Sequence, residues 1–162
     1  MLARISDALT RDGDGALSAV LFIDLDGFKD VDDSLGHEAG DTVLRTAAER
    51  LQRAVRPDDL VARLGGGEVV PLLFGPTANG VLDQVSERLH ATLVAPTRIG
   101  GTVVNVSASS GIAPVGEGDK RDATAILHDA DLAMYAAKAA GPGESRHATQ
   151  LPAATGELLD VN

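Results

Sequence analysis

The apolar run at residues 18–23 restricts the fold of this chain more than any other segment. It reads Ser-Ala-Val-Leu-Phe-Ile and is followed directly by Asp24. A continuous apolar run of this length is typical of a strand that is buried on both faces of a sheet. We therefore expect a strand inside a covered sheet, with the carboxylates of Asp24 and Asp26 at its carboxyl end.

Helices and strands alternate along the rest of the chain. Apolar residues recur at helical spacing near residues 2–9, 28–35, 41–55, 79–93 and 122–140, with Asp41 as the expected N-cap of the third helix. Strand-like runs lie at residues 60–64, 68–74 and 102–112. This order of elements predicts an α+β fold in which helices cover a mixed or antiparallel sheet. Pro71 cannot donate to a ladder, so we expect a bulge or an unpaired side there.

One domain accounts for residues 1–141, and residues 142–162 contain Pro, Gly, Ser and Thr without periodicity, which indicates a flexible tail or linker. The chain has 24 Asp and Glu against 14 Lys and Arg, a formal net charge of −10. This charge repels phosphate backbones and anionic membranes, so we expect no nucleic-acid partner. Because the chain has no cysteine and no apolar run of membrane-spanning length, we expect a cytoplasmic protein without a membrane segment.

Two features carry candidate chemistry: the acidic segment at residues 24–26 and the glycine hairpin that ends in Glu68. Carboxylates at a strand end and on a nearby hairpin suit a Mg²⁺ site for nucleotide phosphates, because Mg²⁺ prefers hard oxygen ligands. The alternative is that the carboxylates cap the next helix and the glycines only form a turn. An EF-hand is excluded because Phe28 and Leu35 occupy its fifth and twelfth positions. The acidic segment also resembles the aspartyl-phosphate motif of haloacid dehalogenase phosphatases, although Phe28 stands where that family has a hydroxyl residue.

Four short blocks follow one another along the chain. They read FIDLDGFK at residues 22–29, LGHEAGD at 35–41, ARLGGGEV at 62–69 and ADLAMYAAK at 130–138. Together these blocks resemble the GGDEF domain of diguanylate cyclases. The resemblance implies a nucleotidyl-cyclase-like fold with a mostly antiparallel five-stranded sheet. It also implies a reaction that joins two GTP molecules into cyclic di-GMP between two domains that face each other.

The resemblance assigns roles to residues that match the family's motifs. Asp24 corresponds to a metal-binding carboxylate, and Leu25 to a residue whose backbone carbonyl binds the metal. Lys29 and Lys138 correspond to lysines that contact phosphate in the family. Asp41 corresponds to a carboxylate that accepts hydrogen bonds from guanine. The implied nucleotide-binding residues are Lys29, Asp32, Asp41, Gly65, Gly66 and Lys138.

Three matching positions carry a different residue type. Gly67 stands where the family has an acid that binds Mg²⁺ and helps to activate the attacking hydroxyl. Asp32 replaces an Asn that recognises guanine, and Pro142 replaces an Arg that contacts phosphate. A carboxylate cannot donate to guanine O6 unless it is protonated. We therefore expect Glu68 to be vestigial and Mg²⁺ binding to be weakened, with GTP as a candidate ligand.

A second site is indicated by Arg56-Pro57-Asp58-Asp59, five residues before the glycine hairpin. This segment resembles the family's inhibitory RxxD site, where cyclic di-GMP binds, with Arg88 as a secondary contact. An Arg fork can grip guanine or phosphate while Asp59 accepts from the base. The alternative is a solvated loop, in which Pro and Asp are common.

The sequence thus predicts a degenerate GGDEF domain that no longer makes cyclic di-GMP and acts as a receptor or regulatory module for it. Its expected partners are cyclic di-GMP and a second copy, another GGDEF-type domain or an effector protein. Two alternatives stay open. One is an active cyclase in which Glu68 and Asp26 rebuild the metal site, and the other is a dimerisation or scaffold domain without a ligand.

Overall fold

The structure is a computed structural model that describes residues 1–76 and 80–150. The helices are α1 (Leu2–Leu9), α2 (Phe28–Leu35), α3 (His37–Ala54), α4 (Val81–Leu93) and α5 (Ala123–Ala140). The strands are β1 (Leu17–Asp26), β2 (Leu60–Gly65), β3 (Glu68–Phe74), β4 (Thr97–Ile99), β5 (Thr102–Val104), β6 (Ser107–Pro114) and β7 (Ser145–His147). Short 3-10 helices lie at Gly13–Gly15 and Ala148–Gln150.

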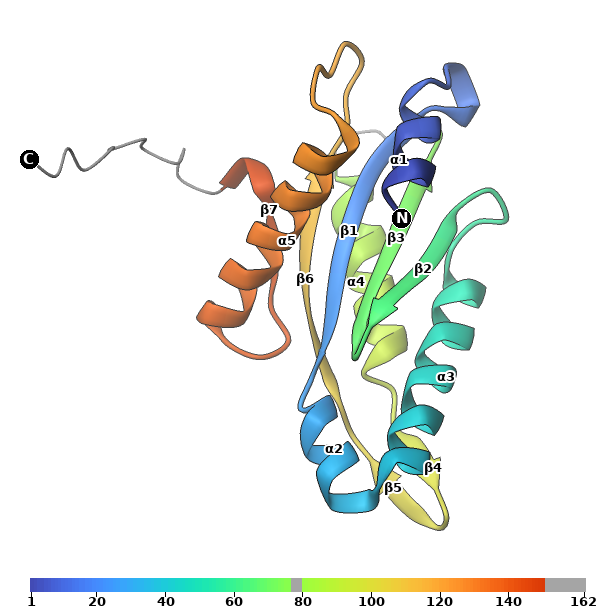
Figure 1. Cartoon of the computed structure of the whole chain (residues 1–162), viewed down its shortest axis with the longest axis vertical. Coiled ribbons are helices and arrows are strands. Elements are labelled where there is room, and N and C mark those ends of the chain that lie inside the picture. The colour runs from blue at the N-terminus through green and yellow to red at the C-terminus, as the bar shows by residue number, and fades with distance from the viewer. Residues whose placement is uncertain (77–79, 151–162) are drawn as a thin grey trace, which may run out of the picture.

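Five strands form one sheet in the order β2-β3-β1-β6-β7, with β1 at its centre (Figure 1). Neighbouring strands are antiparallel except for β6 and β7, which are parallel. Strands β4 and β5 form a separate two-stranded hairpin. The prediction of an α+β fold with a mostly antiparallel five-stranded sheet is therefore confirmed.

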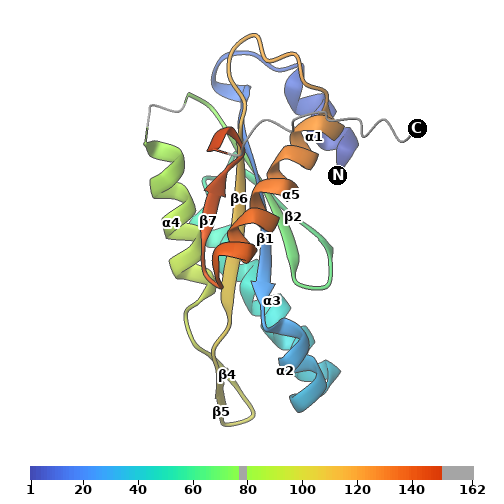
Figure 2. The ribbon, with the colours of Figure 1, turned by 90° about the vertical axis from the view of Figure 1, so that its left-hand side faces the viewer.

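The central strand β1 is buried on both faces, as its apolar run predicts. Leu21 and Ile23 belong to a core that includes α3 and α4, whereas Val20 and Phe22 belong to a second core with α1 and α5. Successive side chains of a strand point to opposite faces, so one run serves both cores. Figure 2 shows α4 and α5 on opposite sides of the strands. This layering holds the carboxyl end of β1 between the two layers of helices.

The sheet meets α5 at very short range at Gly111 of β6. A β-carbon built on this glycine would lie 2.0 Å from the carbonyl oxygen of Ala130 and 2.2 Å from the backbone nitrogen of Met134. Backbone and side-chain atoms do not approach this closely in a packed interior, so only glycine fits here. This contact sets the height of α5 above the sheet and so positions Lys138 in its last turn.

Helix α3 begins earlier than its apolar spacing predicts. It starts at His37 directly after Gly36, whose φ of +88° ends α2 and turns the chain into the next helix. Glycine adopts this φ without the steric cost that a β-carbon adds. Asp41 therefore lies inside α3 and is not its N-cap, which corrects the expectation from the sequence.

The predicted strand at residues 102–112 is two separate strands. The first part, β5, pairs with β4, whereas β6 begins at Ser107 and pairs with β1 in the main sheet. Of the two alternatives that we expect at Pro71, a bulge or an unpaired side, the register fits the second. Pro71 is opposite Val61 of β2, whereas the register of β1 with β3 passes from Leu72 to Val69 without a partner for Pro71. The register shifts lie elsewhere, between Leu17 and Ala19 and between Arg63 and Gly65.

The sheet continues past the expected domain boundary at residue 141. Ser145–His147 form β7 on the edge of β6, and a 3-10 helix follows at Ala148–Gln150. A strand of three residues is too short to show a periodic pattern, which is why the composition indicates a tail. The folded domain therefore extends beyond residue 141. Of the tail predicted for residues 142–162, the part at residues 151–162 lies outside the described residues.

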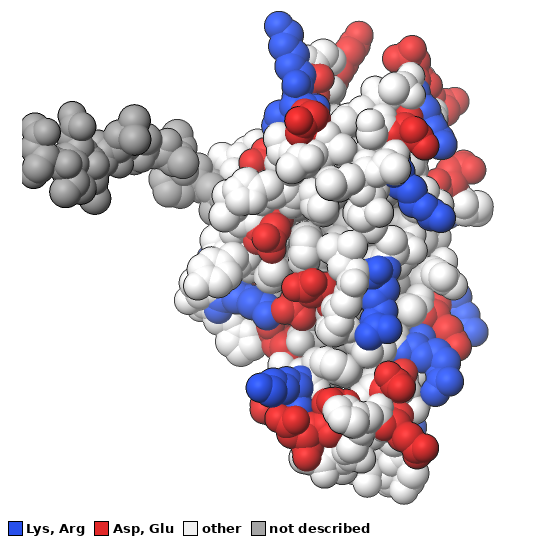
Figure 3. Space-filling view, in the orientation of Figure 1, with Lys and Arg blue, Asp and Glu red and all other residues white. Residues whose placement is uncertain are grey.

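Charged side chains of both signs cover the surface of the domain. Figure 3 shows Lys and Arg interspersed with Asp and Glu on the face seen in Figure 1. The excess negative charge therefore does not exclude local basic positions that could meet a phosphate. Within residues 1–76 and 80–150, no helix combines the length and the hydropathy that crossing a membrane requires.

Candidate functional site

An open pocket of about 550 Å³ lies at the carboxyl end of β1, between the β2–β3 hairpin and the last turn of α5. Gly27, with φ +75°, turns the chain from β1 into α2 beside it. The pocket brings together many of the residues that the sequence predicts for a nucleotide site, namely Asp24, Leu25, Lys29, Gly65, Gly66, Glu68 and Lys138. It therefore combines carboxylates, ammonium groups and glycine backbone, which suits a phosphate-bearing ligand.

Two carboxylates and one ammonium group meet on the wall of this pocket. Asp24 of β1 and Glu68 of β3 are register partners on neighbouring strands. Asp24 is also ion-paired through Oδ2 with Nζ of Lys138. The side chains of Lys138 and Asp24 are 36% and 20% exposed, so solvent screens this pair only partly. A bound phosphate would compete with Asp24 for the same ammonium group.

Gly67 lies against Asp24 without a side chain of its own. Its carbonyl accepts a hydrogen bond from the N–H of Leu25 at 3.1 Å, and a β-carbon built on it would lie 3.0 Å from Oδ1 of Asp24. The neighbouring Gly66 has φ +48°, whereas the φ of Gly67 is outside the left-handed region. A side chain at position 67 would therefore be directed at the Asp24 carboxylate from an ordinary backbone conformation.

The side chains in this pocket do not fit the two-acid Mg²⁺ site that the family resemblance implies. Mg²⁺ needs near-octahedral oxygen ligands at about 2.0–2.1 Å. Across residues 1–76 and 80–150, no group of three or more Asp, Glu or His side chains could hold a metal ion. Asp24 is held by Lys138, and Gly67 supplies no side-chain oxygen. Weakened binding of Mg²⁺ stays a prediction.

Asp26 also lines the pocket, but its contacts serve the fold. Its Oδ2 accepts hydrogen bonds from the hydroxyls of Ser107 at 3.1 Å and Ser109 at 2.8 Å, both on β6. The same oxygen accepts from the N–H of Gly143 at 3.1 Å, in the segment after α5. Asp26 therefore ties three segments together through one oxygen. Nothing in the sequence singles out these three donors, because they lie more than eighty positions away in the chain.

Asp32 and Asp41 lie outside the pocket lining, on the helical hairpin of α2 and α3. Asp32 contacts His37, at 2.7 Å between Oδ2 and Nδ1. A β-carbon on Gly40 would lie 2.4 Å from Oδ1 of Asp32, so the two helices pack closely at this point. Asp41 follows Gly40 and is exposed. The pairing of Asp32 with His37 is absent from the sequence predictions and depends on the turn at Gly36.

The loop from Arg56 to Asp59 connects α3 to β2 and is held in place by Asp59. One carboxylate oxygen of Asp59 accepts from the backbone N–H of Arg56 at 2.9 Å, and the other accepts from the N–H of Phe74 at 3.0 Å. Arg88 of α4 donates to the carbonyl of Ala54 at 3.1 Å, at the end of α3. The structure thus places Arg88 near the start of this loop and leaves Arg56 exposed. It also gives Asp59 a structural role that the motif does not indicate.

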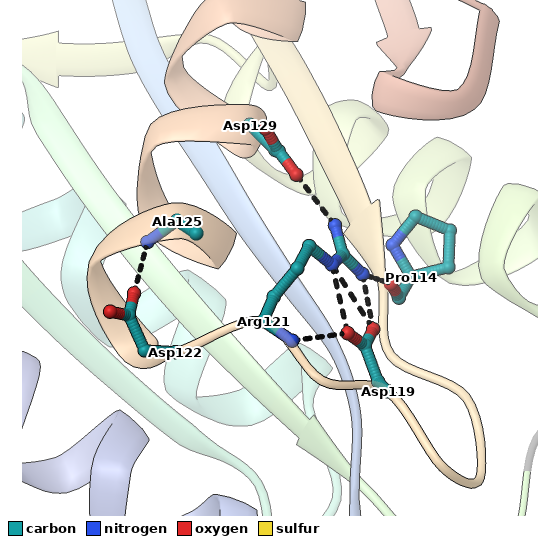
Figure 4. Close-up of polar contacts among 6 residues, drawn as sticks. All are labelled: Pro114, Asp119, Arg121, Asp122, Ala125 and Asp129. Atoms are coloured by element: carbon teal, nitrogen blue, oxygen red, sulfur yellow. Dashed lines mark hydrogen bonds and ion pairs between the residues drawn. The ribbon is translucent and has the colours of Figure 1, made fainter.

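Arg121 organises the loop between β6 and α5, at the far end of the sheet from the pocket (Figure 4). Its guanidinium donates to Asp119 at 2.5 Å, to Asp129 at 2.7 Å and to the carbonyl of Pro114 at 2.5 Å. The hydrogen bond from Arg121 lowers the pKa of Asp119 below its usual value, and the same bond raises the pKa of Arg121 above its usual value. This cluster fixes the start of α5.

The fold and the pocket define an α+β domain that gathers acids, lysines and glycines at the end of its central strand. The family model for "Diguanylate cyclase, GGDEF domain" matches residues 1–144. The chain therefore belongs to the GGDEF domain family.

Relatives place the family in cyclic di-GMP signalling. The chain is 47% identical over 130 residues to the diguanylate cyclase TpbB of Pseudomonas aeruginosa, which covers 79% of this chain and 29% of TpbB. It is 43% identical over 123 residues to MucR of the same species, a bifunctional diguanylate cyclase and cyclic di-GMP phosphodiesterase, covering 76% of this chain and 18% of MucR. The chain thus spans less than a third of the length of these two proteins.

Solved structures of GGDEF domains have the same fold. The crystal structure of the GGDEF domain of TpbB, also called YfiN, matches with a TM-score of 0.80 and 41% identity, over 90% of this chain and 91% of that chain. The GGDEF domain of DgcB from Caulobacter crescentus, in complex with cyclic di-GMP, matches with a TM-score of 0.77 and 26% identity, over 91% and 87% of the two chains.

Proposed function

We propose that this domain binds cyclic di-GMP as a receptor or regulatory module and does not synthesise it. The observation that carries this proposal is at position 67, where a glycine rather than an acid faces Oδ1 of Asp24. Asp24 is already paired with Lys138, so the pocket lacks the set of oxygen ligands that metal-assisted attack by a hydroxyl needs. A second copy, another GGDEF-type domain or an effector protein would receive the signal.

Binding of cyclic di-GMP is assigned to the loop after α3. Arg56 is exposed there, and its planar guanidinium suits guanine or phosphate. Arg88 lies near the start of the same loop, so two cations can meet a ligand that carries two phosphates. Each oxygen of Asp59 accepts one backbone N–H and keeps further capacity to accept from a base. The GGDEF domain of DgcB, which has this fold, was crystallised with cyclic di-GMP.

An active cyclase is the second candidate, and one observation favours it. Glu68 is the register partner of Asp24, and both residues line the pocket. Asp26 weakens this candidate, because its Oδ2 is already used by two hydroxyls and a backbone N–H.

Chromatography of the products formed from GTP and Mg²⁺, together with calorimetric titration with cyclic di-GMP, separates the candidates. We expect turnover below about 0.01 per second and a binding free energy of about −8 kcal/mol. Arg56→Ala should weaken binding more than tenfold, since a charge-assisted contact is lost. Arg53→Ala, at an exposed arginine in the last turn of α3, is the matched control. Cyclic di-GMP formed from GTP would identify an active cyclase, whereas no product from GTP together with no heat from cyclic di-GMP would identify a scaffold domain.

A further inference from the structure

Residues 143–147, which follow α5 and include β7, run along one face of α4. His147 contacts Asp83, at 2.6 Å between Nε2 and Oδ1. The hydroxyls of Ser145 and Ser86 are 3.1 Å apart. Asp83 and Ser86 are three residues apart on α4, and this spacing puts them on the same side of the helix. We refer to residues 143–147 as the strap.

The other end of the strap also contacts α4 and continues to the pocket. A β-carbon built on Gly143 would lie 3.7 Å from Cε1 of His90, one helical turn beyond Ser86. The N–H of Gly143 donates to Oδ2 of Asp26 at 3.1 Å. Asp26 lines the pocket beside Asp24. A continuous series of contacts therefore leads from the first turn of α4, along the strap, to the wall of the nucleotide pocket.

The strap is attached by short, polar contacts. β7 has three residues and pairs with β6 alone, through a parallel ladder from Ser110 to Ile112. The Ser145 hydroxyl lies between those of Ser86 and Ser110, at 2.8 Å from the latter. Every residue of the strap is exposed or only partly buried. Segments with few buried apolar contacts open at a lower free energy than the core of a domain, so the strap can detach while the other four strands of the sheet, β2, β3, β1 and β6, stay paired.

We propose that attachment of the strap to α4 is coupled to the arrangement of the nucleotide pocket. With the strap on α4, Gly143 holds Asp26 together with the two serines of β6. When the strap lifts, Asp26 loses one of these three donors and the pocket wall between Asp26 and Lys138 loosens. Because coupling is reciprocal, a ligand that favours one pocket arrangement shifts the attachment of the strap by the same free energy. The coupling does not depend on the cyclic di-GMP site proposed above, because the ligand used to test it is GTP, the nucleotide that the sequence predicts for this pocket.

The first test needs no ligand. Backbone amide exchange and chemical shifts are followed by NMR in the wild type, in Ser86→Ala and in Ser145→Ala. Each variant removes a hydroxyl that fastens the strap, at a site away from the pocket lining. We expect exchange of the Gly143 amide to rise roughly tenfold and the resonances of Asp26 to shift. Arg146→Ala is the control, because its side chain reaches Glu144 and Ser145 within the strap itself.

The coupling would be overturned by either of two results. One is that Ser86→Ala and Ser145→Ala leave the amide exchange of Gly143 and the resonances of Asp26 as in the wild type. The other is that Arg146→Ala changes the exchange and the resonances as much as the two serine variants do. Melting temperature and the exchange of β1 amides show whether a variant has lost its fold, and Ser86→Thr, which keeps the hydroxyl, should restore the slow exchange of Gly143.

The second test adds GTP and Mg²⁺ to the same proteins in a calorimeter. We expect Ser86→Ala to change the Kd for GTP by roughly threefold or more, and Arg146→Ala to leave it unchanged. Faster exchange at Gly143 with an unchanged Kd would contradict the coupling. A wild type that binds no GTP would contradict the pocket ligand named above, and the exchange experiment would then decide the coupling by itself.

Discussion

A β-carbon on Gly67 would lie 3.0 Å from Oδ1 of Asp24. Gly67 of the β2–β3 hairpin therefore presents only an α-hydrogen to the Asp24 carboxylate at the carboxyl end of β1. The place where a second acid would stand is therefore formed by the backbone but carries no carboxylate. Lys138, from the other side of the pocket, pairs with Asp24 instead. At position 67, the loss of chemistry that we propose is thus the loss of a side chain within an intact backbone.

Gly67→Asp should bind Mn²⁺ or Mg²⁺ in the presence of GTP more tightly than the wild type. The φ of Gly67 allows an L-residue, but the new carboxylate stands beside that of Asp24, so without metal the protein should lose about 1 kcal/mol of stability. Thermal melts with and without Mn²⁺ and GTP measure both effects. Gly116→Asp is the control, because Gly116 lies outside this pocket and its β-carbon would meet nothing within 4 Å. A melting temperature that metal and GTP do not raise would contradict this account.

Synthesis of cyclic di-GMP should stay low in Gly67→Asp and appear in the triple variant Gly67→Asp, Asp32→Asn, Pro142→Arg. The three positions act on one reaction, and residues that act as a unit do not give additive rescue. Product chromatography from GTP and Mg²⁺ compares the single and triple variants. If the single variant matched the triple one, then Asp32 and Pro142 would have no part in the loss of activity.

Gly111→Ala should destabilise the domain by about 3 kcal/mol or more, because a β-carbon there meets the backbone of α5 at 2.0 Å and the helix would have to move. Urea unfolding followed by circular dichroism measures the change in free energy. Gly116→Ala is the matched control, since its β-carbon would meet nothing within 4 Å and should cost less than about 1 kcal/mol. Equal stability of the two variants would show that α5 is not held at Gly111.

Asp119→Asn should lower the free energy of unfolding near neutral pH, and should lower it by less in acid. The hydrogen bond from Arg121 lowers the pKa of Asp119 in the folded state. The Asp119 carboxylate therefore binds a proton more weakly in the folded protein than in the unfolded chain. The resulting stability is present above the ordinary Asp pKa of about 3.9 and is lost as the pH falls through the lower folded value. Denaturant unfolding at pH 7, 5 and 3 tests this sign. A difference between wild type and Asp119→Asn that grows toward pH 3 would refute it.

Local patterns were sufficient to predict the central strand and the residues at its end. The run around Leu21 is apolar on both faces, and β1 is buried on both faces, because that pattern depends only on neighbours in the chain. The residue pattern puts Asp24 and Glu68 at one site, and the family resemblance adds Lys29. All three line one pocket.

Contacts between distant segments could not be predicted in this way. Nothing in the neighbourhood of Gly111 shows that α5 will cross it, and nothing near Asp26 shows that Gly143 will donate to it. β7 has too few residues for a periodic signal, so its place in the sheet depends on partners on β6 and α4. Asp59 shows a further limit, because its motif indicates a ligand contact but not the backbone N–H groups that it accepts from.

The ion pair of Asp24 with Lys138 joins positions that are 114 residues apart in the chain. A growing polypeptide leaves the ribosome with Asp24 long before Lys138, so the carboxylate waits for its ion-pair partner while the intervening segment is made. A product that stops before α5 lacks one side of the pocket altogether. A ligand that needs contacts from both Asp24 and Lys138 can therefore bind only after α5 has been made and has packed on the sheet.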